Sequence, residues 1–288
     1  MKLPREWVRG PQWTSSVSRA NWEPVLRRAQ ETWLELEVAS ITENVRDSAL
    51  VYLTADELPR AARDCAAVGM GFSVLAQEPA GWRVSIHKPG LAAAWYSAWE
   101  GSDNQTIGDL LGFPECCNAF FREHWVCAGS RDVTRAMAGV DGPWEANILL
   151  RWLGVRLVPH LPCSGSCAST LELAGKFKAA GQRMGLDLEA LEAVLRLPAQ
   201  YDAAGEVAIV STPHFRFMAG TDARDQPRVL RRNDGTNKLP EPASHELNGF
   251  ATSNAMRQAH AVVARAAGLV SSALVGSSTL TTSHAGPL

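Results

Sequence analysis

Four of the six cysteines in the chain lie in two short stretches, and this clustering restricts the possible folds more than any other feature. The first pair, Cys116 and Cys117, follows a Gly-Phe-Pro-Glu turn. The second pair, Cys163 and Cys167, lies in a segment where two prolines and a Ser-Gly-Ser turn indicate a shaped loop rather than a strand. If the two stretches meet, the fold brings four sulfur atoms into one small volume.

The first stretch is typical of a helix start. Proline is favoured at the first helical position and Glu115 suits the positive end of the helix dipole, so Cys116 and Cys117 are expected in the first turn. A helix N-terminus lowers the pKa of a thiol and favours the thiolate that metals and electrophiles require. Neighbouring helical residues point about 100° apart, so one ion bound by both sulfurs would be strained. Cys117 shares its face with aromatic residues, which leaves Cys116 as the freer ligand.

The second stretch places His160 beside its two cysteines. A helix is expected over residues 169–184, with Cys167 in its first turn and Cys163 four residues earlier, so both sulfurs can face one point. His160 is a candidate fourth metal ligand or a catalytic acid/base group, because its ordinary pKa near 6.5 lets it take or give a proton close to neutrality. Glu115, at the end of the other loop, is a second candidate for proton transfer.

Hydrophobic periodicity along the chain predicts an α+β protein with a helical centre that carries the Cys/His metal site, flanked by small β-sheets. Before the centre, the pattern predicts a helix over 23–39, a strand over 49–53 and a hairpin of 72–75 with 82–87. Within the centre, an apolar helix is expected over 144–152. After it, strands are expected over 206–211, 214–218 and 228–231, followed by a last helix over 253–267.

These elements divide the chain into four expected regions. Residues 1–104 would hold an N-terminal arm without regular structure over 1–21, a helix and a small α/β layer. Residues 105–200 would form the helical region of the Cys/His motifs, and residues 201–270 the C-terminal strands and helix. Residues 271–288 are rich in Ser, Thr and Gly, which predicts a flexible tail.

The charge balance gives no indication of a nucleic-acid partner, since 28 basic and 30 acidic residues leave a formal net charge of -2. No apolar signal segment and no long apolar run is present, so we expect a soluble, cytoplasmic protein without a membrane partner. In a reducing compartment, clustered cysteines are more often metal ligands or reactive thiols than disulfides. Nucleotide-binding and serine-hydrolase motifs are absent from the sequence, which leaves an unidentified small molecule as the expected substrate.

The motifs Leu111–Cys117, LGFPECC, and Pro159–Cys167, PHLPCSGSC, resemble those of a family of prokaryotic and viral proteins catalogued as a domain of unknown function. The resemblance covers roughly residues 105–185 and is carried by the cysteines. It implies no settled activity. A fainter association links proteins of this kind to 7-deazaguanine modification of phage DNA, which makes a nucleobase-like substrate an expectation.

The leading hypothesis is therefore a metal-dependent enzyme that modifies a nucleobase-like molecule. Cys163, Cys167 and one or both of Cys116 and Cys117 would bind zinc or an iron–sulfur cluster, with His160 as a further ligand or acid/base group. The candidate ligands exceed four and polar groups lie beside them, which favours an open, catalytic site.

Three alternatives remain at the level of the sequence. A non-catalytic binding protein could use the same residues as a structural metal staple. A metal-free enzyme could use a cysteine nucleophile activated by His160. The cysteines could also be buried and unreactive, as free cysteine often is, although their position at two helix starts argues against this.

Overall fold

The computed structural model describes residues 5–78, 81–127, 134, 142–204 and 207–222. The elements before the central region are β1 Arg5–Trp13, α1 Ser16–Thr42, β2 Ser48–Leu53, α2 Leu58–Ala67, β3 Gly71–Glu78 and β4 Gly81–His87. The central region holds α3 Ala92–Glu100, α4 Asn104–Leu110, α5 Glu115–Phe121, the π-helix η1 Arg122–Val126, the 3-10 turns η2 Trp144–Ala146 and η3 Arg151–Leu153, α7 Ala168–Arg183 and α8 Glu189–Leu195. The last strands are β5 Gln200–Ala204, β6 Val207–Ser211 and β7 Phe215–Asp222.

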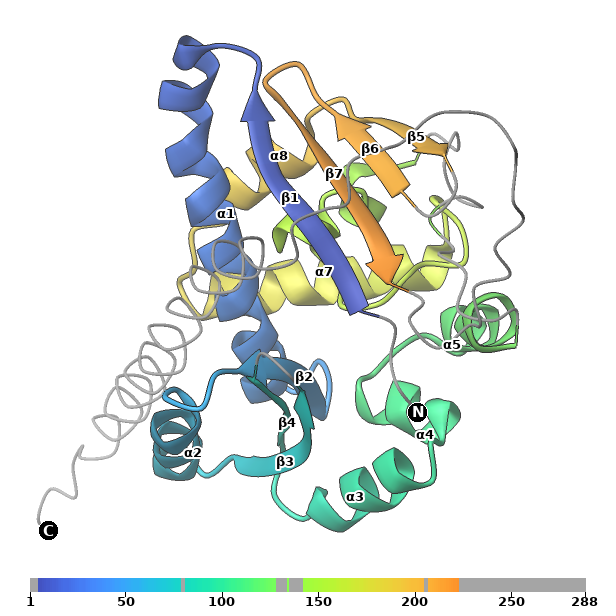
Figure 1. The fold of residues 1–288 in the computed structure, drawn as a ribbon. Coiled ribbons are helices and arrows are strands. Elements are labelled where there is room, and N and C mark those ends of the chain that lie inside the picture. Colours follow the sequence, from blue (N-terminus) through green and yellow to red (C-terminus); the bar gives the residue numbers. More distant parts are fainter. Residues whose placement is uncertain (1–4, 79–80, 128–133, 135–141, 205–206, 223–288) are drawn as a thin grey trace, which may run out of the picture.

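Two small antiparallel sheets lie on either side of the helices, which confirms the α+β prediction (Figure 1). The larger sheet has the order β1-β7-β6-β5, and the smaller one has the order β2-β4-β3. Helices α7 and α8 lie behind the larger sheet in Figure 1, whereas α2 and α3 flank the smaller one. The expected hairpin of the front layer is confirmed as β3 and β4, with an irregularity in register between Val74 and Ala76.

The long helix α1 connects the two sheets: its middle packs in the hydrophobic core under the larger sheet, and its C-terminal end packs in the core under the smaller sheet. Its hydroxyl cap is Ser15, whose side chain accepts a hydrogen bond from the backbone of Ser18. Trp33, in the middle of the helix, stacks on Phe177 of α7 with ring centroids 6.2 Å apart in the larger core. Near its end, Ile41 packs in the smaller core beneath β2 and β4. The predicted helix therefore exists and is longer at both ends.

The expectation of an arm without regular structure over 1–21 is wrong for residues 16–21, which begin α1, and for residues 5–13, which form β1 at the edge of the larger sheet. Its register pairs Val8 with Ala219 and Trp13 with Phe215 of β7. Trp13 also makes an edge contact with the Phe215 ring at 5.3 Å. The local sequence contains glycine and proline and shows no alternation, so it gives no strand signal. The strand forms because β7, from the other end of the described chain, pairs with it.

The prediction of an apolar helix over 144–152 is also wrong, since the structure has two separate 3-10 turns there. Asn147 interrupts the helix: its side-chain oxygen accepts from the backbone of Leu149 at 3.0 Å, and its amide donates to the carbonyl of Leu195 at 2.8 Å. Asparagine commonly replaces helical hydrogen bonds in this way. Four of the apolar residues that suggested a helix, Ala146, Ile148, Leu150 and Trp152, are buried, but in an irregular segment.

Several sequence predictions lie outside the described residues: the strand over 228–231, the helix over 253–267 and the tail over 271–288. The domain boundaries at 104, 200 and 270 stay predictions. None of the helices in the described part of the chain is both long enough and apolar enough to cross a membrane.

Candidate metal centre

The turn before α5 places the first cysteine pair against the rest of the molecule. Gly112 ends α4 with a φ of +70°, a left-handed conformation that favours glycine. A Cβ atom at this position would also lie only 2.8 Å from the Cβ of Arg46. Phe113 then packs its ring 5.5 Å from the ring of His160. The glycine and the aromatic residue of the LGFPECC motif thus position the start of α5.

Helix α5 presents both cysteines from its first turn, as the sequence predicted. Pro114 caps the helix rather than forming its first residue, and its carbonyl accepts from the backbone of Cys117 at 2.9 Å. Asn118, which is buried, donates to the backbone carbonyl of Gln105 in α4 at 3.1 Å. Glu115 is exposed on the first turn. The amide of Asn118 therefore fixes α5 on α4, and with it the direction of the sulfur atoms.

The second cysteine pair comes from the loop before α7 and from the cap of that helix. Cys167 is the N-cap residue of α7, and its backbone N–H donates to the carbonyl of Ser164 at 3.3 Å, which closes the Ser-Gly-Ser turn. Gly165 of this turn is covered closely by Gly142, where a Cβ would lie 2.4 Å from the Gly165 oxygen. The loop is therefore packed into a defined shape.

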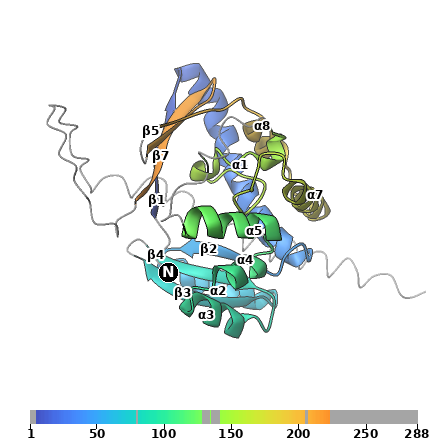
Figure 2. The same ribbon diagram turned by 90° about the vertical axis from the view of Figure 1, so that its right-hand side faces the viewer.

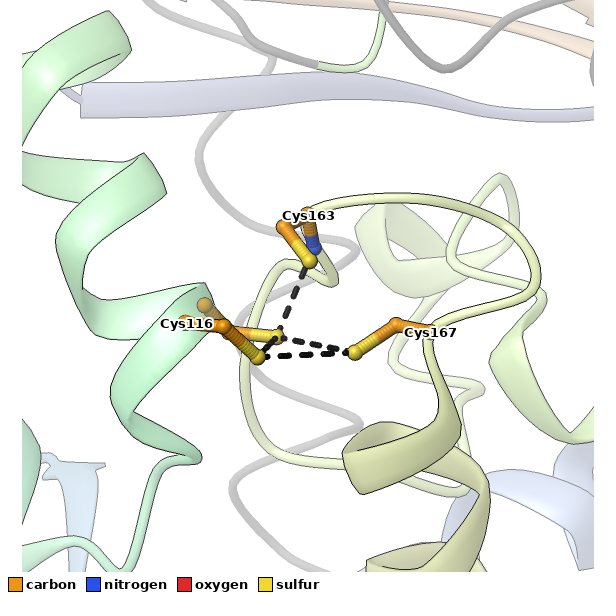
Figure 3. Close-up of side chains that lie close together, drawn as sticks. Cys116, Cys163 and Cys167 are labelled. Carbon is orange, nitrogen blue, oxygen red and sulfur yellow. Dashed lines mark hydrogen bonds between the residues drawn. The ribbon is translucent and has the colours of Figure 1, made fainter.

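All four sulfur atoms converge between α5, the loop and α7 (Figure 3). They lie within 4.8 Å of one another. The Sγ atoms of Cys116 and Cys117 are 3.9 Å apart, and each is 3.7 Å from the Sγ of Cys167. Their adjacent positions in the helix still leave the two sulfurs close together. Both cysteines belong to the group.

This spacing suits a metal ion. Zinc–sulfur bonds of about 2.3 Å in a tetrahedron place neighbouring sulfurs about 3.8 Å apart. Zinc and iron–sulfur clusters are the usual partners of several thiolates. The four cysteines are therefore compatible with a site for a metal such as zinc or an iron–sulfur cluster.

The sulfur of Cys117 has hydrogen-bond contacts outside the sulfur group. The Sγ of Cys117 lies 3.3 Å from the Thr170 hydroxyl and accepts from the backbone N–H of Cys163 at 3.4 Å. Burial raises the pKa of Cys117 and also raises the pKa of Cys163, to about 11. Burial is the largest single influence on Cys167 and opposes its ionisation, but the neighbouring groups of Thr170, Cys163 and Cys117 together lower the pKa of Cys167 to about 6.

His160 does not belong to the sulfur group, and the side chain of Thr170 lies between it and Cys117. Its Nε2 atom is 2.9 Å from the hydroxyl of Thr170, which in turn contacts Cys117. Its Nδ1 atom is buried and has no hydrogen-bond partner among the described residues. His160 is therefore connected to the sulfurs through Thr170.

The charges of two arginines that share one acidic partner, Glu37, act on His160. Arg46 pairs with Glu37 and donates from Nε to the Ser40 hydroxyl at 2.7 Å, and Arg156 lies 3.8 Å from the same glutamate. Burial lowers the pKa of His160 most, and the charges of Arg156 and Arg46 lower it further, to about 3. The imidazole is neutral at physiological pH.

Thr170 is the site residue that sequence reasoning missed. Its signal was available, because a residue three positions after Cys167 lies on the same face of the predicted helix. Threonine inside a helix commonly bonds to its own backbone, and nothing in the sequence shows that His160 folds back onto it.

Comparisons with models of protein families, with curated proteins and with solved structures found no match for this chain. The chemistry of the centre is therefore derived from its own geometry.

Proposed function

We propose that this protein binds a single zinc ion through the thiolates of Cys116, Cys117, Cys163 and Cys167. The observation that carries the proposal is the spacing of 3.7 to 3.9 Å among the sulfurs of Cys116, Cys117 and Cys167, which matches the edge of a zinc tetrathiolate tetrahedron. The sulfur of Cys163 lies within 4.8 Å of these three. The Sγ of Cys117 accepts a hydrogen bond from the backbone N–H of Cys163 and lies 3.3 Å from the Thr170 hydroxyl, and such contacts stabilise a thiolate ligand, as the neighbours of metal ligands usually do.

A single ion fits this spacing better than a cluster does. In an iron–sulfur cluster each thiolate binds a different iron or shares one with a second thiolate, so four thiolates spread farther apart than around one ion. All four sulfurs here lie within 4.8 Å of one another. Zinc, which has no redox chemistry of its own, is the common occupant of closed sites with four cysteines.

The proposed ion would join two parts of the chain that meet at the centre of the molecule. Figure 2 shows α5 at the level between the smaller sheet and α7. Two ligands come from α5, and two come from the loop and start of α7. Because unfolding would separate these ligands, the free energy of zinc binding would contribute to folding stability.

A second role, zinc-dependent chemistry, is favoured by the uneven burial of the ligands. Cys117 and Cys167 are buried, but Cys116 is exposed and Cys163 partly exposed, so one edge of the site faces solvent. The buried, neutral His160 suits a positioning role better than acid/base catalysis. Glu115 is the candidate proton-transfer group at the exposed edge. A nucleobase-like substrate and a 7-deazaguanine step stay predictions.

Metal analysis of three purified proteins tests the proposal. The unchanged chain should contain one zinc per molecule, and Cys163→Ser should lose most of it. Cys127→Ser is the matched control, because Cys127 is an exposed cysteine outside the group and its removal should leave the zinc content unchanged. Equal zinc content in Cys163→Ser and Cys127→Ser, or iron with acid-labile sulfide in the unchanged chain, would refute the proposed zinc site.

A further inference from the structure

The four sulfurs of the centre have unequal surroundings. The Sγ of Cys117 contacts the Thr170 hydroxyl and the Cys163 backbone N–H. The Sγ of Cys167 lies 3.7 Å from the sulfurs of Cys116 and Cys117, but Cys167 is buried. Among the described residues, the Sγ of Cys116 has hydrogen-bond contacts with other sulfurs alone, those of Cys117 and Cys167. It is also the exposed member of the group.

This difference matters for reactivity at a zinc tetrathiolate. Four thiolates around one zinc ion carry excess negative charge, and a bound thiolate is deprotonated and remains nucleophilic. Hydrogen bonds to a thiolate withdraw part of its charge and lower its nucleophilicity. The sulfur that has no such bonds and faces solvent is therefore the most reactive of the four. In this centre that sulfur is the one of Cys116.

We propose that Cys116 is the nucleophile of the zinc centre and accepts an alkyl group from a small carbon electrophile. The inference rests on the proposed zinc site. In the step, an electron pair of the Cys116 thiolate forms a sulfur–carbon bond while the bond between that carbon and its leaving group breaks. The leaving group departs with the bonding pair, no proton is transferred, and Cys116 becomes a thioether. The substrate class is an alkyl donor with a good leaving group.

Cys163 is the other candidate, and its position makes it less suitable. It is only partly exposed, and its own backbone N–H is turned toward the sulfur of Cys117 (Figure 3). Cys116 projects from the first turn of α5 at the surface. An electrophile from solvent therefore meets Cys116 first.

The chain contains an internal reference for the test. Cys127 directly follows η1, is exposed, and does not belong to the sulfur group. An ordinary exposed thiol is only a few per cent thiolate at pH 7, whereas a zinc-bound cysteine is fully deprotonated. Exposure alone would make the two cysteines react at similar rates. A faster reaction at Cys116 would therefore reflect the centre and not the surface.

The experiment treats the full, zinc-loaded chain with a limiting amount of iodoacetamide at pH 7 and follows each cysteine by peptide mass. Cys116 should be alkylated at least tenfold faster than Cys127, with one zinc retained after the first alkylation. Cys127→Ser should keep the fast reaction, and Cys116→Ser should lose it. Because the unchanged chain already separates the sites, the result does not depend on whether Cys116→Ser folds.

Three results would overturn the inference: Cys127 reacting as fast as Cys116, Cys163 reacting first, or all four cysteines reacting together as zinc is released. Zinc content measured on the same sample separates the two proposals. Zinc-loaded protein in which Cys116 is alkylated slowly would refute only the proposed role of Cys116 as the nucleophile. Protein that binds no zinc would refute the proposed function and, with it, the role of Cys116.

Discussion

Thr170 links His160 to the sulfur of Cys117 by two successive hydrogen bonds of its hydroxyl group. The buried Nδ1 of His160 has no partner in the described residues, and a buried donor without a partner is more costly than a buried acceptor. The proton of the neutral ring therefore belongs on Nε2, which donates to the Thr170 oxygen. The hydroxyl proton is then directed toward Cys117, where it stabilises a thiolate ligand.

Replacing Thr170 tests this chain of hydrogen bonds. Thr170→Val keeps the shape of the side chain but removes the hydroxyl, and we expect zinc affinity to fall by about 10- to 100-fold, as is typical for the partners of metal ligands. Thr170→Ser keeps the hydroxyl and should stay close to the unchanged chain. Competition for zinc with a chromophoric chelator measures both. Similar affinities for the valine and serine variants would show that the hydroxyl is not involved.

The pKa of His160 predicts a loss of stability in mild acid. Its pKa is about 3 in the folded protein, below the ordinary value of about 6.5, so the unfolded chain binds an extra proton between these values. The free energy of unfolding should therefore fall as the pH drops below about 6.5, with a slope approaching about 1.4 kcal/mol per pH unit.

His160→Gln is the matched variant, because glutamine keeps an N–H donor for Thr170 but does not titrate. Urea unfolding between pH 5 and pH 7 should show a smaller pH dependence for this variant than for the unchanged chain. Equal slopes would mean that His160 is not held neutral by the fold.

At the scale of single residues, the sequence predicted the four cysteines because thiols at two helix starts are a specific pattern. It did not predict that His160 lies behind the sulfurs, because the position of a loop side chain depends on the elements packed against it. Of the two arginines whose charges lower its pKa, Arg156 lies four residues before His160, but Arg46 comes from a distant part of the chain. Their joint effect on its pKa has no local signal.

At the scale of elements, the contact between α4 and α5 sets the direction of the first cysteine pair. Gly108 of α4 faces Asn118 of α5 so closely that a Cβ would lie 2.3 Å from the Asn118 amide. Gly108→Ala should therefore destabilise the protein by about 1–3 kcal/mol, as overpacking of a close contact does. Denaturant unfolding would measure the change.

Gly175 in α7 provides the control for this substitution. A Cβ at Gly175 would meet no atom within 4 Å, so Gly175→Ala should raise stability by up to about 1 kcal/mol through helix propensity alone. If both alanine variants changed stability in the same direction, the packing of Asn118 on Gly108 would not be the cause.

The elements that the sequence predicted are those with a strong local pattern. The amphipathic stripe of α1 and the alternation of β3 and β4 depend on the residues themselves. The edge strand β1 depends on β7 from the other end of the described chain, and the turns η2 and η3 depend on the side-chain hydrogen bonds of Asn147. Local periodicity contains neither kind of information.

At the scale of the whole molecule, α1 and the metal centre each connect parts of the fold that are distant in the sequence. Helix α1 contributes to both hydrophobic cores, and the centre joins α5 to α7. The sequence predicted two small sheets around a helical centre. It did not predict that one helix would contribute to both hydrophobic cores, because the hydrophobic pattern of a helix does not show which core each of its residues enters.

Removal of zinc should lower the thermal stability of the chain. Zinc present at about a thousand times its dissociation constant stabilises a folded protein by about 4 kcal/mol, provided that the unfolded chain does not bind it. For a protein of this size, the melting temperature would then fall by about 10 °C on treatment with a strong chelator. The chelator should lower the melting temperature of Cys127→Ser by the same amount. It should change the melting temperature of Cys163→Ser very little, because that variant has already lost the zinc. A melting temperature insensitive to the chelator would contradict a stabilising role.

The coordination of zinc in the purified chain tests the central claim most directly. X-ray absorption at the zinc edge should show four sulfur neighbours at about 2.3 Å and no nitrogen neighbour. A nitrogen neighbour at about 2.0–2.1 Å would place His160 in the coordination shell and contradict the position assigned to it here. A spectrum with fewer than four sulfurs would contradict the site of Cys116, Cys117, Cys163 and Cys167.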